Sequence, residues 1–230
     1  MSAVVQAVGL LKTNEGVDLG DYLDVLGGRD PGGPRRGWTQ AISRVRLGFA
    51  GPSAGEKRQA VLALARVREG DQVIDVGCGP GECTRHLARA AGEGLTIGLD
   101  ASEAMVATAA AKADRENLAY LRGDACALPF EDETFDVACS AGAIQWVEEP
   151  MVALGEMARV LAPGGRLVVA SSHARRDRRH GARGGATVFG GDELTAALRE
   201  CGLGEIGQKA IRRGQVVVAQ KPEEGGSDGS

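Results

Sequence analysis

The chain alternates short apolar runs with segments of helical periodicity between residues 57 and 222. Runs such as QVIDV (72–76) and FDVACS (135–140) fit strands that are buried on both faces of a parallel sheet. Residues 150–161 instead repeat apolar side chains at helical spacing. We predict strands at 72–76, 95–99, 118–121, 135–140, 166–170 and 215–219, and helices at 57–68, 82–91, 102–112, 150–161 and 191–202.

Strands that alternate with helices predict an α/β domain with a doubly wound, mostly parallel sheet between helices, at residues 57–222. Ligands of such sheets bind beyond the carboxyl ends of the strands. Residues 1–56 are expected to form a helical cap or lid over these ends, which would exclude water and help to select the substrate. Residues 223–230 contain no apolar side chain and are predicted to be a disordered tail.

Composition narrows the class of partner. The net charge of −4 gives no global attraction to nucleic acid, which disfavours such a partner. The chain has neither an apolar run long enough to span a bilayer nor a basic leader, so we expect a cytoplasmic protein. The formation of a homodimer is left open by the sequence. No C-x-x-C pair occurs and we expect no metal site, so the cysteines are expected to be small buried hydrophobes. They are Cys78, Cys83, Cys126, Cys139 and Cys201.

A glycine cluster, DVGCGPG at 75–81, directly follows the first predicted strand. Such a turn needs residues without a Cβ, and it lets backbone N–H groups face a ligand at the start of a helix. A tight turn with no ligand is the alternative. A nicotinamide site is disfavoured, because its G-x-G-x-x-G pattern places the third glycine one residue later than Gly81.

Two further strand ends carry acidic residues. Asp100, in GLDAS, can accept both hydrogen bonds of a ribose diol, although it can also cap the helix that starts near Ser102. Asp124, in GDACALPF, can accept from an exocyclic amine, and the N–H of Ala125 can donate to a ring nitrogen. Three neighbouring strand ends therefore predict a crevice for an adenosine.

These motifs, together with RVLAPGGRLVV at 159–169, resemble those of class I S-adenosylmethionine-dependent methyltransferases over about residues 57–172. The ubiquinone and menaquinone biosynthesis branch (methyltransferase type 11) is the most similar, and GAIQWVEEP (142–150) is similar to a segment of malonyl-carrier-protein carboxyl methyltransferases. The resemblance implies a seven-stranded Rossmann-like sheet and S-adenosylmethionine as cofactor.

The reaction implied by the resemblance is in-line methyl transfer to a small-molecule acceptor, such as a quinone, phenol or carboxylate. Alternatives are transfer to RNA or to a carrier-protein-bound substrate, or a non-catalytic nucleoside-binding partner subunit. The implied cofactor site comprises Asp75, Gly77, Cys78, Gly79, Gly81, Asp100, Ala101, Met105, Gly123, Asp124, Ala125, Ser140 and Ala141.

The acceptor side is expected to include Tyr22, Trp38, Gln145, Trp146 and His173. Trp146 can equally be a half-buried packing residue. His173 follows the fifth strand and is the candidate catalytic base, although a solvent-facing loop histidine is the alternative. The arginine-rich stretch that begins at His173 is either a solvated loop or a lid that recognises an anion.

Overall fold

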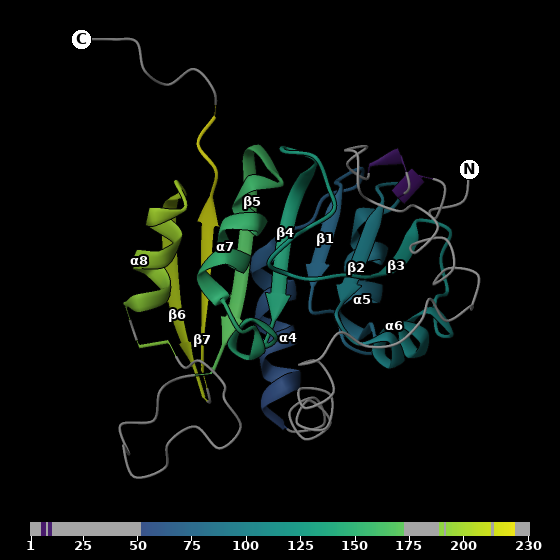
Figure 1. The fold of residues 1–230 in the computed structure, drawn as a ribbon, viewed down its shortest axis with the longest axis horizontal. Coiled ribbons are helices and arrows are strands. Elements are labelled where there is room, and N and C mark those ends of the chain that lie inside the picture. The colour runs from purple at the N-terminus through teal and green to yellow at the C-terminus, as the bar shows by residue number, and fades with distance from the viewer. Residues whose placement is uncertain are drawn as a thin grey trace.

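The computed structural model describes residues 6–7, 9–10, 52–172, 189–190, 192–212 and 214–223. These residues form one seven-stranded sheet with helices on both faces, so the predicted doubly wound, mostly parallel α/β fold is confirmed (Figure 1). Most of the predicted amino-terminal cap and nearly all of the predicted tail lie outside the described residues. Near the amino terminus, Ala7 is fully buried in the larger of the hydrophobic core clusters, and Leu10 packs against that cluster.

The strand order is β3-β2-β1-β4-β5-β7-β6. Strands β1 to β5 run parallel, and β7 is antiparallel to both of its neighbours. The order reverses between β1 and β4, which are hydrogen-bonded neighbours, and such a switch point leaves a crevice beyond the strand ends. The strands are β1 (Val73–Val76), β2 (Thr96–Asp100), β3 (Leu118–Arg122), β4 (Phe135–Ala141), β5 (Leu161–Ser171), β6 (Gly204–Ile211) and β7 (Gly214–Gln220).

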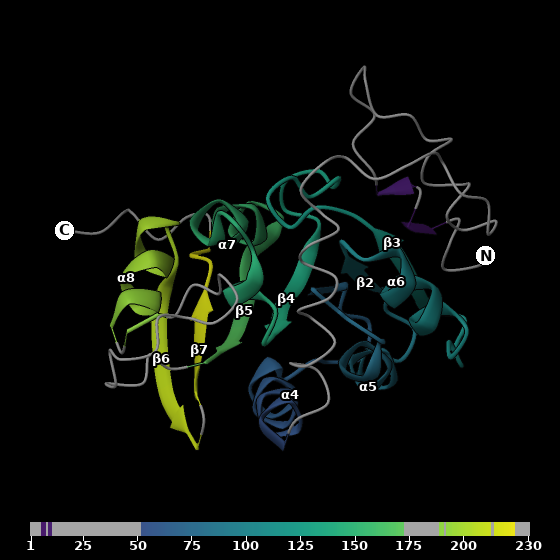
Figure 2. The same ribbon diagram turned by 60° about the horizontal axis from the view of Figure 1, so that its bottom comes forward.

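The helices bury apolar stripes against the two faces of the sheet. Figure 2 shows α7 and α8 on one side of the sheet and α4 and α5 on the other. Leu154 of α7 and Leu198 of α8 belong to the larger core cluster, whereas Val61 of α4 and Leu87 of α5 belong to a second. The helices are α4 (Pro52–Ala65), α5 (Glu82–Ala91), α6 (Glu103–Ala110), the 3-10 helix η1 (Ile144–Trp146), α7 (Pro150–Arg159) and α8 (Glu193–Glu200).

The main differences from the sequence prediction concern α4, β5 and β6. Helix α4 begins at Pro52 rather than at residue 57 and ends earlier, because proline suits the first turn of a helix. Strand β5 begins at Leu161, and its pairing with β4 shifts register between Phe135 and Val137. Strand β6 was not predicted, because it is an edge strand with mostly exposed side chains that is held by pairing to β7. No helix in the described ranges is both long and apolar enough to cross a membrane.

Candidate active site

The glycine turn after β1 has the backbone geometry that only glycine adopts readily. Gly77, Gly79 and Gly81 have φ angles of 75°, 54° and 76°. A Cβ at Gly77 would lie 2.1 Å from the Cβ of Ala143, so the turn touches the segment after β4. The N–H of Gly77 donates to the carbonyl of Leu99 over 2.7 Å, which fastens the turn to β2. The turn is therefore a fixed element between two strand ends.

Asp100, the last residue of β2, holds this turn through its carboxylate. Its Oδ2 accepts from the N–H of Gly79 (2.8 Å) and its Oδ1 accepts from the N–H of Ser102 (2.9 Å). Burial raises the pKa of Asp100, while these two backbone hydrogen bonds act in the opposite direction. The α6 N-cap is Ser102, whose Oγ accepts from the N–H of Met105. Each oxygen of Asp100 accepts one of these bonds, which leaves acceptor capacity for a ribose diol.

Asp75 lies beneath the turn and is fully buried. Its Oδ2 accepts from the hydroxyl of Thr84 over 2.7 Å, and its Oδ1 accepts from the thiol of Cys139 over 3.7 Å. Burial raises the pKa of Asp75 to about 6, with the Thr84 and Cys139 hydrogen bonds opposing the rise. At neutral pH this carboxylate is mostly ionised, so it suits a cationic ligand group better than a neutral one.

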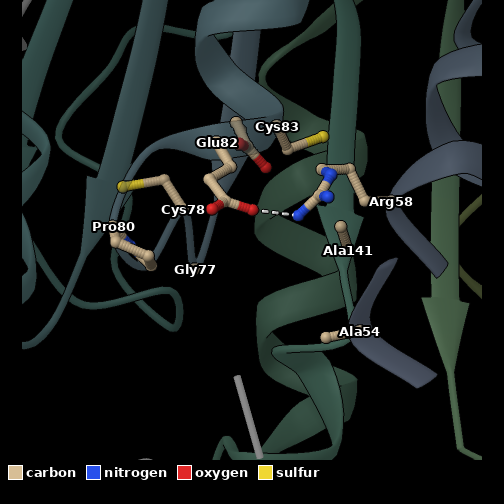
Figure 3. Close-up of a pocket in the computed structure, with 9 residues that line it drawn as sticks. Ala54, Arg58, Gly77, Cys78, Pro80, Glu82, Cys83 and Ala141 are labelled. Atoms are coloured by element: carbon tan, nitrogen blue, oxygen red, sulfur yellow. Dashed lines mark hydrogen bonds and ion pairs between the residues drawn. The ribbon is translucent and has the colours of Figure 1, made fainter. Parts of the chain in front are cut away.

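A pocket opens at the switch point between the glycine turn, the start of α4 and the end of β4 (Figure 3). The Arg58 guanidinium on α4 forms an ion pair with Glu82, the first residue of α5, and this pair bridges the two helices. The pocket is therefore lined by both charged and apolar side chains. Its lining comprises Ala54, Arg58, Asp75, Gly77, Cys78, Pro80, Glu82, Cys83 and Ala141.

The predicted adenine side begins where β3 ends. The N–H of Gly123 donates to the carbonyl of Asp100 over 3.1 Å, so this end is tied to the predicted ribose residue. Asp124 is exposed, and its Oδ1 accepts from the N–H of Cys126 over 2.9 Å. Ala125 is partly buried and packs against the larger core cluster. Ala101 is exposed at the same edge.

The predicted acceptor side follows β4. Ser140 is buried, and within the described part of the chain its Oγ has no hydrogen-bond partner. Gln145 in η1 is buried, and its Oε1 accepts from the N–H of Ser172 over 2.7 Å, whereas Trp146 is partly buried. Both η1 residues therefore stay candidates for the acceptor side. Tyr22, Trp38 and His173 lie outside the described residues.

Lys57 is a further residue at this edge, and the residue pattern does not single it out. This side chain of α4 is only 5% exposed, and its Nζ donates to the Oγ of Ser172 over 2.7 Å. Burial lowers the pKa of Lys57, while the nearby charge of Glu56 raises it. A lysine in a helical segment is usually solvated, so its burial could not be read from the residue pattern. Only the packing of α4 against the ends of β4 and β5 shows it.

The site includes no recognisable metal centre in the described ranges. No three His, Cys, Asp or Glu side chains gather there closely enough to hold a metal ion. The polar groups at the switch point are instead backbone N–H groups and carboxylates, the donors and acceptors that bind a nucleoside. Fold and site thus define a doubly wound domain with a nucleoside-type crevice.

Comparison with known proteins identifies this domain. Residues 74–169 match the family described as the methyltransferase domain. A demethylmenaquinone methyltransferase of Shouchella clausii is 42% identical over 115 residues, which cover 48% of this chain and 49% of that protein. The chain thus spans about half the length of the curated relatives it matches. Together with the fold, this match makes residues 74–169 similar to the methyltransferase domain of class I S-adenosylmethionine-dependent enzymes.

Solved structures extend the similarity along the chain. A SAM-dependent methyltransferase from Aquifex aeolicus has a TM-score of 0.63 and 26% identity over 77% of this chain and 97% of that one. The [4+2]-cyclase SpnF has a TM-score of 0.65 and 21% identity over 96% and 93% of the two chains. The fold is therefore shared by proteins named for different activities, and it does not by itself define the reaction of this chain.

Proposed function

We propose that this protein is a methyltransferase that uses S-adenosylmethionine to methylate a small molecule bearing an acidic hydroxyl or carboxyl group. The observation that carries the proposal is the pair formed by the glycine turn and Asp100 at the switch point. This pair supplies a rigid main-chain surface and a carboxylate with spare acceptor capacity, which fit the two ends of an adenosyl amino acid.

The residues present fit this cofactor by the chemistry of their donors and acceptors. Asp75 and the turn at Gly77 and Gly79 would hold its amino-acid end, since a mostly ionised buried carboxylate favours a cation. Asp100 would bind the ribose, and Asp124 with Ala125 would frame the adenine. Ser140 and Ala141, at the end of β4, would lie beside the reactive methyl group.

When bound, the cofactor supplies a methyl group attached to a positively charged sulfur, which leaves as a neutral thioether. The protein therefore need not protonate a leaving group. Its work is to orient the acceptor in line with the methyl group and to exclude water. A base is required only where the acceptor atom carries a proton at neutral pH. Among the residues predicted from sequence, His173 remains the candidate for that role.

A small-molecule acceptor is favoured by what the relatives are called and by the charge of this chain. The Shouchella clausii relative is named for methylation of demethylmenaquinone, which is a small molecule. The net charge of −4 gives no general attraction to an RNA backbone. RNA is therefore included in the labelling assay as the competing acceptor.

Two measurements on the full chain test the proposal. Calorimetry should show binding of S-adenosylmethionine and S-adenosylhomocysteine and no binding of NAD, because the turn lacks the dinucleotide glycine spacing. A radiolabelled methyl assay should then transfer label to a panel of reduced demethylmenaquinone, a simple phenol and an aromatic acid, with total RNA as the competitor. Absence of cofactor binding would refute the whole proposal. Label that enters only RNA would refute its small-molecule part.

A further inference from the structure

Lys57 is a buried lysine at the edge of the sheet where ligands bind, and the proposed cofactor site does not use it. Its Nζ donates to Ser172 Oγ over 2.7 Å, just beyond the carboxyl end of β5. A Cβ on Gly142, just beyond β4, would lie 3.0 Å from Lys57 Cδ. A Cβ on Gly214, at the start of β7, would lie 3.4 Å from Lys57 Cε. Three strands and α4 therefore enclose this side chain at one edge.

The position of Lys57 adjoins the pocket. Ala54 and Arg58, which are neighbours of Lys57 on α4, line the pocket. Ala141 of β4 also lines it, and Gly142, the residue against the Lys57 stem, comes next in the chain. Ser172 further connects Lys57 to η1, because its N–H donates to Gln145 Oε1. Lys57 thus lies beside the segment in which the acceptor is expected.

The charged surroundings of Lys57 are sparse. On the same helix, the charge of Glu56 raises the pKa of Lys57. The Glu56 carboxylate also accepts from the N–H of Arg212 over 2.7 Å. The close neighbours of Lys57 at the ends of β4, β5 and β7 include Gly142, the Ser172 hydroxyl and Gly214. No carboxylate of the described residues forms an ion pair with its Nζ, and burial of an unpaired ammonium favours the neutral amine.

We propose that Lys57 is the catalytic base on the acceptor side, where its neutral amine takes the proton of an acceptor hydroxyl. This inference rests on the proposed function. The acceptor O–H bond breaks and a third N–H bond forms at Nζ, which gives the ammonium. The freed oxygen lone pair forms the new bond to the methyl carbon, and the electron pair of the carbon–sulfur bond goes to sulfur. The proton leaves Lys57 for water once the product has gone.

A labelling experiment on the full chain tests the state of this amine without any acceptor. The chain is acetylated with trace acetic anhydride from about pH 6 to about pH 10. Mass spectrometry then measures the extent of acetylation at each lysine. Lys57 should become reactive at lower pH than the exposed Lys112. Titration of Lys57 together with Lys112, or no labelling of Lys57 at any pH, would overturn the proposal, because either result denies a neutral amine accessible from the pocket.

Substitution separates catalysis from structure. Lys57→Met keeps the length of the side chain and should lower kcat on a hydroxyl acceptor, such as a reduced quinone, by about 100-fold or more. The acid limb of the pH–rate profile should disappear. Affinity for S-adenosylhomocysteine should stay within about twofold, and the melting temperature should hold or rise, because an unpaired buried amine is removed. Lys112→Met is the matched control and should leave every readout unchanged.

The outcomes distinguish the two proposals. If Lys57→Met melts at a lower temperature and keeps its kcat, Lys57 is a structural residue and this inference fails while the proposed function stands. If the unaltered chain binds no S-adenosylhomocysteine, the proposed function fails first. If the acid limb persists in Lys57→Met, another group such as His173 is the base, and Lys57 has no proton-transfer role.

Discussion

Asp100 and Gly79 are joined by a hydrogen bond of 2.8 Å between the Gly79 nitrogen and the Asp100 Oδ2 atom. The two residues are 21 positions apart in the chain. Gly79 lies in the turn after β1, and Asp100 is the last residue of the neighbouring strand β2. Because Asp100 also accepts from the N–H of Ser102, one carboxylate fixes the glycine turn and the start of α6 together. The residue expected to bind the ribose thus also shapes the surface expected to hold the rest of the cofactor.

Replacement of Asp100 by alanine should therefore weaken cofactor binding and the fold at once. Two backbone N–H groups lose a charged acceptor, each worth about 1.5–3 kcal/mol, and we expect affinity for S-adenosylhomocysteine to fall by about 100-fold. Calorimetry and thermal unfolding measure the two effects. Asp114→Ala, which removes a surface partner of Arg89, is the control and should leave the affinity unchanged. Unaltered affinity in Asp100→Ala would contradict the assigned role.

Asp75→Asn should stabilise the protein at neutral pH. The pKa of Asp75 is raised to about 6 in the folded chain, above its ordinary value, so the ionised form is disfavoured by folding. For such a group the stability is fully present below the ordinary pKa and is lost as the pH rises through about 6. At about pH 8 the asparagine variant should be more stable by about 1–3 kcal/mol.

The pH series supplies the check on this prediction. The stability difference between Asp75→Asn and the unaltered chain, measured by urea unfolding, should shrink as the pH falls from about 7 to about 4. Affinity for S-adenosylmethionine should meanwhile fall, because the charge opposite its cationic end is gone. A difference in stability that is constant with pH would show that Asp75 does not titrate in this range.

Gly77→Ala should be strongly destabilising for two separable reasons. A left-handed backbone costs an alanine about 1–2 kcal/mol, and the new Cβ would lie 2.1 Å from the Cβ of Ala143. Overpacking of this kind costs about 1–3 kcal/mol more. Adding Ala143→Gly should restore the second part and leave the first. A double-mutant cycle by chemical unfolding measures this coupling, and additive effects would refute the contact.

Gly155→Ala provides the comparison for this cycle. Gly155 lies within α7, and a Cβ there would meet nothing within 4 Å. Alanine suits a helix better than glycine, so the variant should be more stable by about 0.5–1 kcal/mol. Glycine-to-alanine substitution is thus expected to lower the stability at Gly77 and to raise it at Gly155, because only Gly77 has a left-handed backbone and a close neighbour.

Arg159→Lys should loosen the segment that follows the predicted adenine residues. The Arg159 guanidinium donates to the carbonyls of Phe130 (2.8 Å) and Leu128 (3.0 Å) and to the carboxylate of Glu156. The carboxylates of Glu156 and Asp132 raise the pKa of Arg159, so its charge is always available. Lysine keeps the charge but lacks the planar fork, and we expect a loss of about 1–3 kcal/mol in unfolding free energy.

The control for this prediction is Arg89→Lys. The Arg89–Asp114 pair is exposed, and such pairs contribute little in water. Thermal unfolding should therefore show no measurable shift for Arg89→Lys and a clear decrease for Arg159→Lys. Equal melting temperatures for both variants would show that the carbonyl contacts of Arg159 do not stabilise this segment.

The fold class was readable from the sequence because parallel strands buried on both faces are short apolar runs. All six predicted strands occur, and the helix predicted at 82–91 has those bounds. Strand β6 was missed, because its side chains are mostly exposed and it is held by pairing with β7 rather than by an apolar pattern of its own. The start of α4 was placed late, because the apolar pattern begins after Pro52 and the proline, which suits the first turn of a helix, was not read as its start.

The sequence by itself determined the glycine turn and the acid that ends β2, because a left-handed backbone and a strand-end carboxylate are tied to particular residue types. It also determined the order of the strand-end motifs along the chain. The tertiary structure alone decided that Asp100 bonds to Gly79, that Arg58 pairs with Glu82, and that Lys57 is buried beside Ser172. Each of these contacts joins segments distant in sequence, and only the order of strands in the sheet brings them together.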